Sequence, residues 1–457
     1  MSVPKLDPGA LEELHQVESE LDTRWSETKI EPSLARIAAL VDVLADPHKA
    51  YPVVHIAGTN GKTSTTRMID ALFTRLGLRT GRFTSPHLQI VTERISLDNA
   101  PIAPERYVEV YRDVEPYLEM IDAKSDVRMS KFEVLTGMAF AAFADAPVDV
   151  AVLETGLGGS WDATNVADAR IAVITPIGVD HVEYLGPDIL GIAREKAGII
   201  KPGSIALLAE QDPEVARVLL ERATEVDATV ARQGLEFGVL QHDVAVGGQV
   251  LKLQGLGGVY DDIFLPLHGA HQAANAALAL AAVEAFFGAG AQRQLDVEAV
   301  REGFASVGSP GRLERVRTAP SVFVDAAHNP HGAAALAAAL DEEFDFRRLV
   351  GVVAVLSDKD ATGILSALEP VLTDLVVTTN SSQRAMDPDR LAAIAVEIFG
   401  DDRVTVEARL DDAIETAVRL AEETDDPDAP VAGGGVVATG SVVTAGEVRA
   451  LFGKEPA

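Results

Sequence analysis

The feature that most constrains this chain is a glycine-containing loop between an apolar run and an amphipathic stretch. Residues 52–57 read Pro-Val-Val-His-Ile-Ala, and residues 58–65 read Gly-Thr-Asn-Gly-Lys-Thr-Ser-Thr. A strand, a tight glycine turn, a lysine and hydroxyl residues at the start of a helix are the parts of a phosphate-binding loop. The pattern therefore predicts an α/β fold in which a helix N-terminus binds the phosphates of a nucleotide.

The residues of this loop have distinct chemical uses. Gly58 and Gly61 allow a sharp turn and a close approach of the backbone to phosphate oxygens. Lys62 reaches the outer phosphates, and Thr63 or Ser64 binds a phosphate or Mg²⁺. The loop is two residues shorter than the common GxxxxGK[ST] form, which narrows the families to which the chain can belong.

Composition indicates a globular protein outside the secretory pathway. The chain has 457 residues, of which 47% are hydrophobic and 24% charged, enough for two or three domains. Cysteine is absent, which favours a reducing compartment. The N-terminal residues lack the apolar core of a signal peptide, and no apolar run has membrane-spanning length. We therefore expect a cytoplasmic protein without a membrane partner.

The net charge of −31 argues against nucleic acid as a partner, because binding to a phosphate backbone needs clustered cations. A protein this acidic must gather its cations locally to bind a nucleotide. The basic residues in or beside Gly-rich or turn segments are Lys62, Arg82, Arg94, Lys196 and Arg312. For Arg82 and Arg94, scattered solvated charges remain an equally good interpretation.

The order of apolar runs predicts two α/β domains. Strands are expected at residues 53–57, 148–153, 171–175 and 204–208, with helices between them. Residues 239–267 alternate apolar and polar residues around glycines, which is typical of hairpins.

A Gly/Pro-rich break at 307–312 precedes renewed strand–helix alternation. We expect a P-loop-type ATPase domain with a mostly parallel sheet and a small hairpin subdomain over residues 1–306. A Rossmann-like α/β domain is expected over 307–457. The acidic stretch 421–435 is expected to be a mobile loop.

Other polar residues follow predicted strands. Glu154 ends one strand and opens the Gly-rich run 155–159, where open α/β sheets place catalytic groups, and its carboxylate suits Mg²⁺. Asp180-His181 follows the next strand. Asp325 and His328 share a strand-to-helix turn, for which a plain turn is the alternative interpretation.

Lys196 is expected on a helix beside Glu195. Its ordinary interpretation is an exposed ion pair of little energetic value.

These motifs together resemble the folylpolyglutamate synthase/dihydrofolate synthase family of the Mur ligase superfamily, in its bacterial bifunctional form. The resemblance covers almost the whole chain. The matching segments, in family order, are 58–62, 84–88 with 93–95, 154–165, 180–181 with 185–186, 195–198, 268–272 with 275–276, 310–312, 325–330 and 439–441.

The resemblance implies an ATP-dependent ligase that adds L-glutamate to dihydropteroate and to folate γ-glutamyl tails through an acyl phosphate. Its small-molecule partners would be dihydropteroate or folate, L-glutamate and ATP, and the family leads us to expect a monomer. Residues 1–306 would be the Mur-ligase central-type domain and 307–457 the glutamate-ligase domain. Lys62, His181, Lys196 and His328 would be catalytic.

The resemblance also implies a set of ligand contacts. ATP would be held by Gly58, Thr59, Asn60, Gly61, Lys62, Thr63, Ser64, Asn275, Arg312 and Asp325. One Mg²⁺ would be bound by Ser85 and Glu154, and a second by His181 with a carbamylated Lys196. The other substrates would contact Thr84, Pro86, Arg94, His328 and Ser441.

Two residues depart from the family pattern. Thr63 stands where many members have Gly, and Ser160 replaces the Arg of the family's Leu-Gly-Gly-Arg run, which removes a cation from the loop.

Three alternatives remain open: a monofunctional folylpolyglutamate synthase, a Mur-type peptidoglycan-precursor ligase, and a regulatory nucleotide-binding protein with a degenerate site. The segment before Gly58 is too short for the extra N-terminal domain expected of the Mur-type enzyme. The balance of the two activities, the polyglutamate chain length, the modification of Lys196 and the effect of Ser160 do not follow from the sequence.

Overall fold

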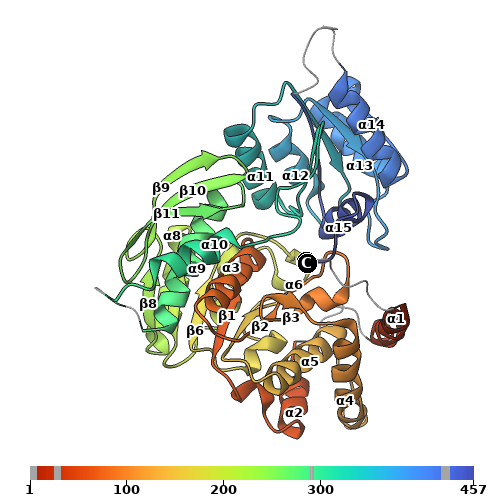
Figure 1. Ribbon diagram of the computed structural model, residues 1–457. Helices are drawn as coiled ribbons and strands as arrows, with labels where there is room; N and C mark the ends of the chain where they lie inside the picture. Colours follow the sequence, from red (N-terminus) through yellow and green to blue (C-terminus); the bar gives the residue numbers. More distant parts are fainter. Residues whose placement is uncertain (1–7, 25–31, 289, 291–292, 424–432) are drawn as a thin grey trace.

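The computed structural model describes residues 8–24, 32–288, 290, 293–423 and 433–457, and these fold around three sheets (Figure 1). The described residues up to Ser306 make up what we call the N-terminal part. The described residues from Leu313 onward make up the C-terminal part. The chain passes from one part to the other between Ser306 and Leu313.

The N-terminal part is centred on an eight-stranded sheet of order β4-β3-β2-β5-β1-β6-β7-β8. Pairing is parallel from β2 to β8 along the sheet, and the β2–β3 and β3–β4 pairs at one edge are antiparallel. The strands are β1 (Val53–Ala57), β2 (Thr80–Phe83), β3 (Ile95–Leu97), β4 (Ala100–Pro101), β5 (Val150–Glu154), β6 (Ile171–Ile174), β7 (Ile205–Leu208) and β8 (Thr229–Arg232).

Helices cover both faces of this sheet, so its central strands read as continuous apolar runs. The helices are α1 (Pro8–Asp22), α2 (Ala35–Val43), α3 (Lys62–Arg75), α4 (Pro104–Asp122), α5 (Lys131–Asp145), α6 (Val182–Leu185), α7 (Ile189–Ala197), α8 (Pro213–Glu225), α9 (Ala270–Phe286) and α10 (Val297–Ala305).

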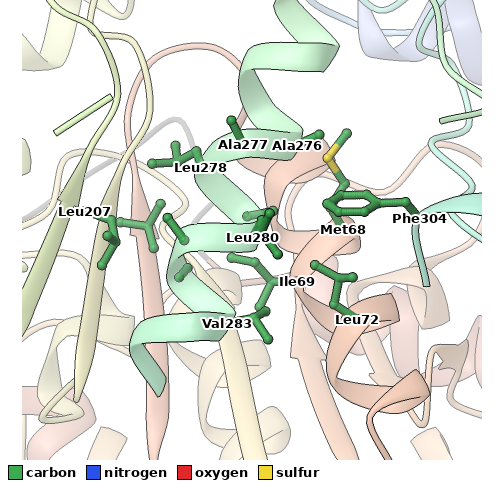
Figure 2. Packing of buried hydrophobic residues seen from close by; sticks show 14 of the residues in the cluster. Met68, Ile69, Leu72, Leu207, Ala276, Ala277, Leu278, Leu280, Val283 and Phe304 are labelled. Carbon is green, nitrogen blue, oxygen red and sulfur yellow. The ribbon is translucent and has the colours of Figure 1, made fainter. Parts of the chain in front are cut away.

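Alternate residues of β1 point to opposite faces of the sheet. Val54 and Ile56 belong to the core under α3 and α9, and Val53 belongs to the core under α2, α4 and α5. Figure 2 shows Ile69 and Leu72 of α3 facing Leu280 and Val283 of α9, with Phe304 of α10 beside them. This packing anchors α3, so the loop before it is held on a rigid base.

Three antiparallel strands form a small sheet against α9, as the alternating pattern predicted. They are β9 (Gly238–Ala245), β10 (Gly248–Gln254) and β11 (Val259–Leu265). The buried carboxylate of Glu284 on α9 accepts hydrogen bonds from Gly257 N and Tyr260 Oη, which fastens the β10–β11 turn to the helix.

The C-terminal part has a six-stranded sheet of order β12-β13-β17-β14-β15-β16, parallel except for β12. Its strands are β12 (Glu314–Thr318), β13 (Ser321–Val324), β14 (Arg348–Val353), β15 (Asp374–Val377), β16 (Val404–Val406) and β17 (Gly434–Thr439). Its helices are α11 (Pro330–Glu343), α12 (Ala361–Leu368), α13 (Pro388–Phe399), α14 (Leu410–Glu422) and α15 (Val442–Leu451).

The predicted α/β architecture is confirmed, and the corrections to it are local. The expected loop at 421–435 is wrong at both ends, because α14 runs to Glu422 and β17 begins at Gly434; residues 424–432 lie outside the described residues. The strands β2, β3, β4, β8 and β12 were not expected. Among the described residues, no helix combines the length and apolarity needed to cross a membrane.

Candidate functional site

The loop after β1 has the geometry of a helix N-terminus open to a ligand. Gly58 and Gly61 adopt φ of +150° and +85°, and α3 begins at Lys62. A Cβ at Gly58 would lie 1.8 Å from Thr175 Oγ1, and one at Gly61 would lie 2.6 Å from Asn275 Oδ1. Both positions therefore require glycine, for the backbone angle and for the space.

Lys62 lies across the mouth of this loop. Its Nζ donates to Gly58 O and Thr59 O, both at 3.2 Å. Burial lowers the pKa of Lys62, and the charge of Glu154 opposes that shift. Within the described ranges this ammonium makes no ion pair, so it can exchange the two carbonyls for phosphate oxygens without breaking one.

Glu154 is the anionic group next to the loop. It is 1% exposed at the end of β5, and its Oε1 accepts from Thr63 Oγ1 at 2.9 Å. Its buried Oε2 has no hydrogen-bond partner among the described residues, and burial raises the pKa of the carboxyl. A carboxylate oxygen left unsatisfied beside Ser85 is suited to a hard cation.

Glu154 and Ser85 suit a Mg²⁺ that is also bound by substrate phosphates. Within the described ranges, no group of three or more His, Asp or Glu side chains could hold a metal by itself. Mg²⁺ is commonly bound by one or two carboxylates together with substrate phosphates and waters. Glu154 with its free oxygen and the Ser85 hydroxyl fit that type of site.

Lys196 is buried, so its interpretation as an exposed ion pair with Glu195 is wrong. The residue is 4% exposed, and its Nζ donates to Gly58 O at 2.7 Å. Glu195 instead accepts from Gly159 N at 3.2 Å and Trp161 N at 3.3 Å, because α7 packs against the Gly-rich loop. Burial, assisted by the charge of Lys62, lowers the pKa of Lys196 to about 7.

Asp180 and His181 project from the segment after β6. His181 has φ of 52° in the left-handed region, and burial lowers its pKa to about 3, which leaves the imidazole neutral. Asp180 receives Lys359 Nζ on Oδ1 at 2.7 Å and Asn329 Nδ2 on Oδ2 at 3.0 Å. Although burial opposes it, the hydrogen bond from His328 and the charge of Lys359 hold the pKa of Asp180 well below its usual range.

The C-terminal part supplies the facing wall. Asp325 follows β13 and accepts from Leu313 N and Ala327 N, both at 2.8 Å, and burial raises its pKa. His328 Nε2 lies 3.5 Å from Asp180 Oδ2. Ser441 is the N-cap of α15, where its Oγ accepts from Thr444 N at 3.0 Å.

A cavity of about 620 Å³ lies between the two walls. It brings together most of the residues expected from the sequence: Thr59, Asn60, Gly61, Lys62, Thr63, Ser64, Ser85, Pro86, Glu154, His181, Asn275, Arg312, Asp325, His328 and Ser441. Gly58, at the start of the phosphate loop, and Lys196, which donates to Gly58 O, do not line the cavity.

Thr84 and Arg94 do not line the cavity either. Both are buried, Thr84 N donates to Arg94 O at 3.0 Å, and Arg94 Nε donates to His87 Nδ1 at 2.9 Å. Arg82 is also buried and pairs with Asp70 at 2.7 Å, so neither of its sequence interpretations, site cation or solvated charge, is correct. These groups stabilise the segment that presents Ser85 and Pro86.

Several cavity residues were not singled out from the sequence. Lys359 and Arg384 come from loops of the C-terminal part, and Arg36, Phe132 and Trp161 come from the N-terminal part. For Lys359 a signal existed, since Ser357-Asp-Lys-Asp360 is a polar run that follows β14 closely. For Arg36 the sequence offers none, because its pairing with Glu133 joins residues far apart in the chain.

The chain is similar to known proteins over most of its length. The description "Mur ligase middle domain" matches residues 56–283, and "Mur ligase, glutamate ligase domain" matches residues 311–427. A dihydrofolate synthase/folylpolyglutamate synthase of Mycobacterium tuberculosis is 61% identical over 468 residues, covering 98% of this chain and 96% of that protein. An Escherichia coli protein of the same name is 34% identical, covering 81% and 82%.

Solved structures agree with this comparison. Folylpolyglutamate synthase of Mycobacterium tuberculosis complexed with ADP superposes with a TM-score of 0.94 at 60% identity, covering 98% of this chain and 100% of that one. Escherichia coli FolC in complex with DHPP and ADP superposes with a TM-score of 0.83 at 31% identity, covering 96% and 97%.

Proposed function

Since this chain belongs to the dihydrofolate synthase/folylpolyglutamate synthase family of the Mur ligases, we propose that it is an ATP-dependent acid–amino-acid ligase with both activities. It joins L-glutamate to dihydropteroate, giving dihydrofolate, and to the γ-glutamyl tail of reduced folates. The observation that carries the proposal is the cavity, whose one wall is the phosphate loop with Lys62 and Glu154 and whose other wall holds Asp325, His328 and Ser441.

The two parts of the chain would divide the work. We propose that residues 1–306 are the ATP-binding domain and 307–457 the glutamate-ligase domain. The ranges of the two family descriptions, 56–283 and 311–427, support this division. The passage between Ser306 and Leu313 would be the hinge between them.

ATP would be held mainly by the backbone and side chains of residues 58–64. Lys62 would bind the outer phosphates, with its carbonyl contacts as the resting arrangement. Asn275 and Arg312 would contact the nucleotide from the two sides of the cavity, with Asp325 at its ribose or phosphates.

Ser85 and Glu154 would hold one Mg²⁺, for which the unsatisfied Glu154 Oε2 is the support. His181 and a carbamylated Lys196 would hold a second. The neutral imidazole of His181 is suited to bind a metal, and Lys196, with a pKa of about 7, is suited to carbamylation. When bound, Mg²⁺ neutralises charge on the phosphate oxygens.

The reaction would proceed in two transfers. An oxygen of the substrate carboxylate bonds to the γ-phosphorus as the bond to the ADP oxygen breaks, which leaves an acyl phosphate. The amine of L-glutamate then attacks the acyl carbon, loses a proton, and phosphate departs. Lys62 stabilises the phosphoryl oxygens throughout, and His328 and Ser441 would position the glutamate and the γ-phosphate.

The acyl phosphate makes the exclusion of water important, because water would hydrolyse it and waste ATP. A cavity with one wall from each part can exclude water only while the parts are together. The catalytic arrangement is therefore complete only in the closed form of the molecule.

The proposal is tested by incubating purified protein with Mg-ATP and L-glutamate, adding 7,8-dihydropteroate in one reaction and a reduced folate monoglutamate in another. Products are identified by mass. Glutamate addition in both reactions supports the bifunctional enzyme, and addition to the folate alone supports the monofunctional folylpolyglutamate synthase. Addition in neither, with ATP still bound, contradicts ligase function and makes Ser160→Arg the next variant to assay.

We further propose that the enzyme acts as a monomer in the cytoplasm on small molecules alone. The absence of cysteine and the net charge of −31, unfavourable to nucleic acid, support this. Light scattering at several protein concentrations measures the mass, and a value above that of one chain would contradict the monomer.

A further inference from the structure

Asp180 belongs to the N-terminal part, but most contacts of its carboxylate come from side chains of the C-terminal part. Lys359 Nζ donates to Oδ1 at 2.7 Å, Asn329 Nδ2 donates to Oδ2 at 3.0 Å, and His328 Nε2 lies 3.5 Å from the same Oδ2. The side chains of Asp180 and Lys359 are 8% and 6% exposed. This is therefore a buried ion pair between the two parts, at the edge of the cavity.

The pair is connected to the phosphate loop. Asn329, which donates to Asp180, also donates to Asn60 Oδ1 at 3.1 Å, and Asn60 Nδ2 lies 2.8 Å from His331 Nδ1. One continuous set of hydrogen bonds thus joins the loop that faces the phosphates, the segment after β6, and the start of α11. Separating the two parts would break all of these bonds together.

Burying a carboxylate and an ammonium is costly unless they stay paired, so the arrangement is strongly selective for the closed form. In the open form both groups regain water and lose each other. The Asp180–Lys359 pair should therefore add little to the free energy of unfolding, but it specifies one relative position of the two parts.

We propose that Asp180 is a positioning residue for ligation, whose carboxylate gathers Lys359, His328 and Asn329 against the phosphate loop and so fixes the closed, water-excluding form. The inference rests on the proposed function. It assigns Asp180 no contact with a reacting atom. By fixing the closed form, Asp180 keeps water away from the acyl phosphate until the amine of glutamate attacks.

The test is the ratio of ATP consumed to glutamate ligated, measured for Asp180→Asn in the full chain. The amide keeps the size of the side chain but removes the charge that pairs with Lys359. We expect kcat for ligation to fall at least about tenfold, since misplacement of a reacting group can cost about a hundredfold. ATP consumed per product should rise severalfold, while ADP binding to the Lys62 loop stays close to wild type.

Glu343→Gln is the matched control. Glu343 is also a buried carboxylate between the two parts, with a side chain 1% exposed, and it pairs with His268 at 2.6 Å outside the cavity. Its loss should lower stability and leave the ratio of ATP to product unchanged. The same rise in that ratio for Glu343→Gln would show that any weakened contact uncouples the enzyme, which would overturn the assignment to Asp180.

Lys359→Met and the double variant complete the experiment. If the pair acts as a unit, Asp180→Asn combined with Lys359→Met should be no worse than the more damaging single variant. Lys359→Met also serves if Asp180→Asn fails to fold, and it too should raise ATP use per product. A wild-type ratio in a folded Asp180→Asn or Lys359→Met contradicts the inference. Absence of ligation by the wild type contradicts the proposed function instead.

Discussion

At the scale of single residues, Gly61 of the phosphate loop and Gly77 after α3 share a positive φ but differ in the space around them. Gly61 has both a positive φ of +85° and a crowded Cβ position, 2.6 Å from Asn275 Oδ1. Gly77, at the end of α3, has nearly the same φ, +88°, but nothing lies within 4 Å of its Cβ position. Comparing substitutions at Gly61 and Gly77 therefore distinguishes the effect of backbone strain from the effect of lost space beside the nucleotide.

Gly61→Ala should weaken ATP binding about tenfold, because about 1–2 kcal/mol of strain is relieved only by distortion of the loop. Gly77→Ala should lower the free energy of unfolding by about 1 kcal/mol and leave ATP binding unchanged. Calorimetric titration with ATP and urea unfolding measure the two quantities. Equal loss of ATP affinity in both variants would contradict the role given to the space at Gly61.

Lys196 leads to a prediction on pH. Burial lowers its pKa from 10.5 to about 7, so the amine is mostly neutral above pH 7 and protonated below it. Only the neutral amine attacks CO₂ to form a carbamate, with release of a proton. At limiting bicarbonate, activity should therefore fall as the pH drops through about 7, and added bicarbonate should restore part of it.

Initial rates against pH, with and without bicarbonate, test this prediction. Lys196→Met should be poorly active at every pH and insensitive to bicarbonate. If added bicarbonate does not change the wild-type rate at any pH tested, Lys196 acts as an unmodified amine.

At the scale of elements, α5 shows how a local signal sets the end of a helix beside the cavity. Ser130 Oγ accepts from Glu133 N at 3.2 Å, and Glu133 Oε2 accepts from Ser130 N at 2.7 Å, a complete capping box. Glu133 also pairs with Arg36 at 2.9 Å. The cap thus positions both the first turn of α5, with Phe132, and a cation in the cavity wall.

Ser130→Ala should lower the free energy of unfolding by about 1 kcal/mol through the loss of this cap. Ser19→Ala is the comparison, because the exposed Ser19 hydroxyl donates to His15 O of its own helix. Urea unfolding of both variants gives the difference. A loss in Ser19→Ala as large as in Ser130→Ala would mean that the cap has no special value.

Features set by neighbouring residues were predictable from the sequence, and those set by distant residues were not. The glycine turn after β1 and the helix that follows it depend on residues within about one turn of each other. The burial of Lys196 depends on α7 packing under the phosphate loop, far away in the chain. The pairing of Asp180 with Lys359 joins two polar runs that each look like ordinary strand-end turns.

At the scale of the whole molecule, the net charge of −31 opposes compaction. Ion pairs relieve this locally, as between Arg112 and Glu20, but the excess of carboxylates leaves repulsion over the surface. Salt screens such repulsion over about 10 Å at 0.1 M. The molecule should therefore be stabilised by added salt.

Raising NaCl from about 10 mM to about 300 mM should raise Tm by about 2 °C. Differential scanning calorimetry measures the change. NaCl is preferred to sulfate, which would strengthen apolar burial by itself. A Tm that falls with NaCl would mean that attractive surface pairs outweigh the repulsion.

The passage between Ser306 and Leu313 has a consequence for synthesis on the ribosome. Every strand of the eight-stranded sheet, and α3 with its loop, leaves the ribosome before β12 is made. At about 5–20 residues per second, the N-terminal part has several seconds to fold before its partner exists. The nascent chain could then bind ATP at residues 58–64 before the C-terminal part exists to close the cavity over it. During synthesis, ATP binding would therefore precede ligation.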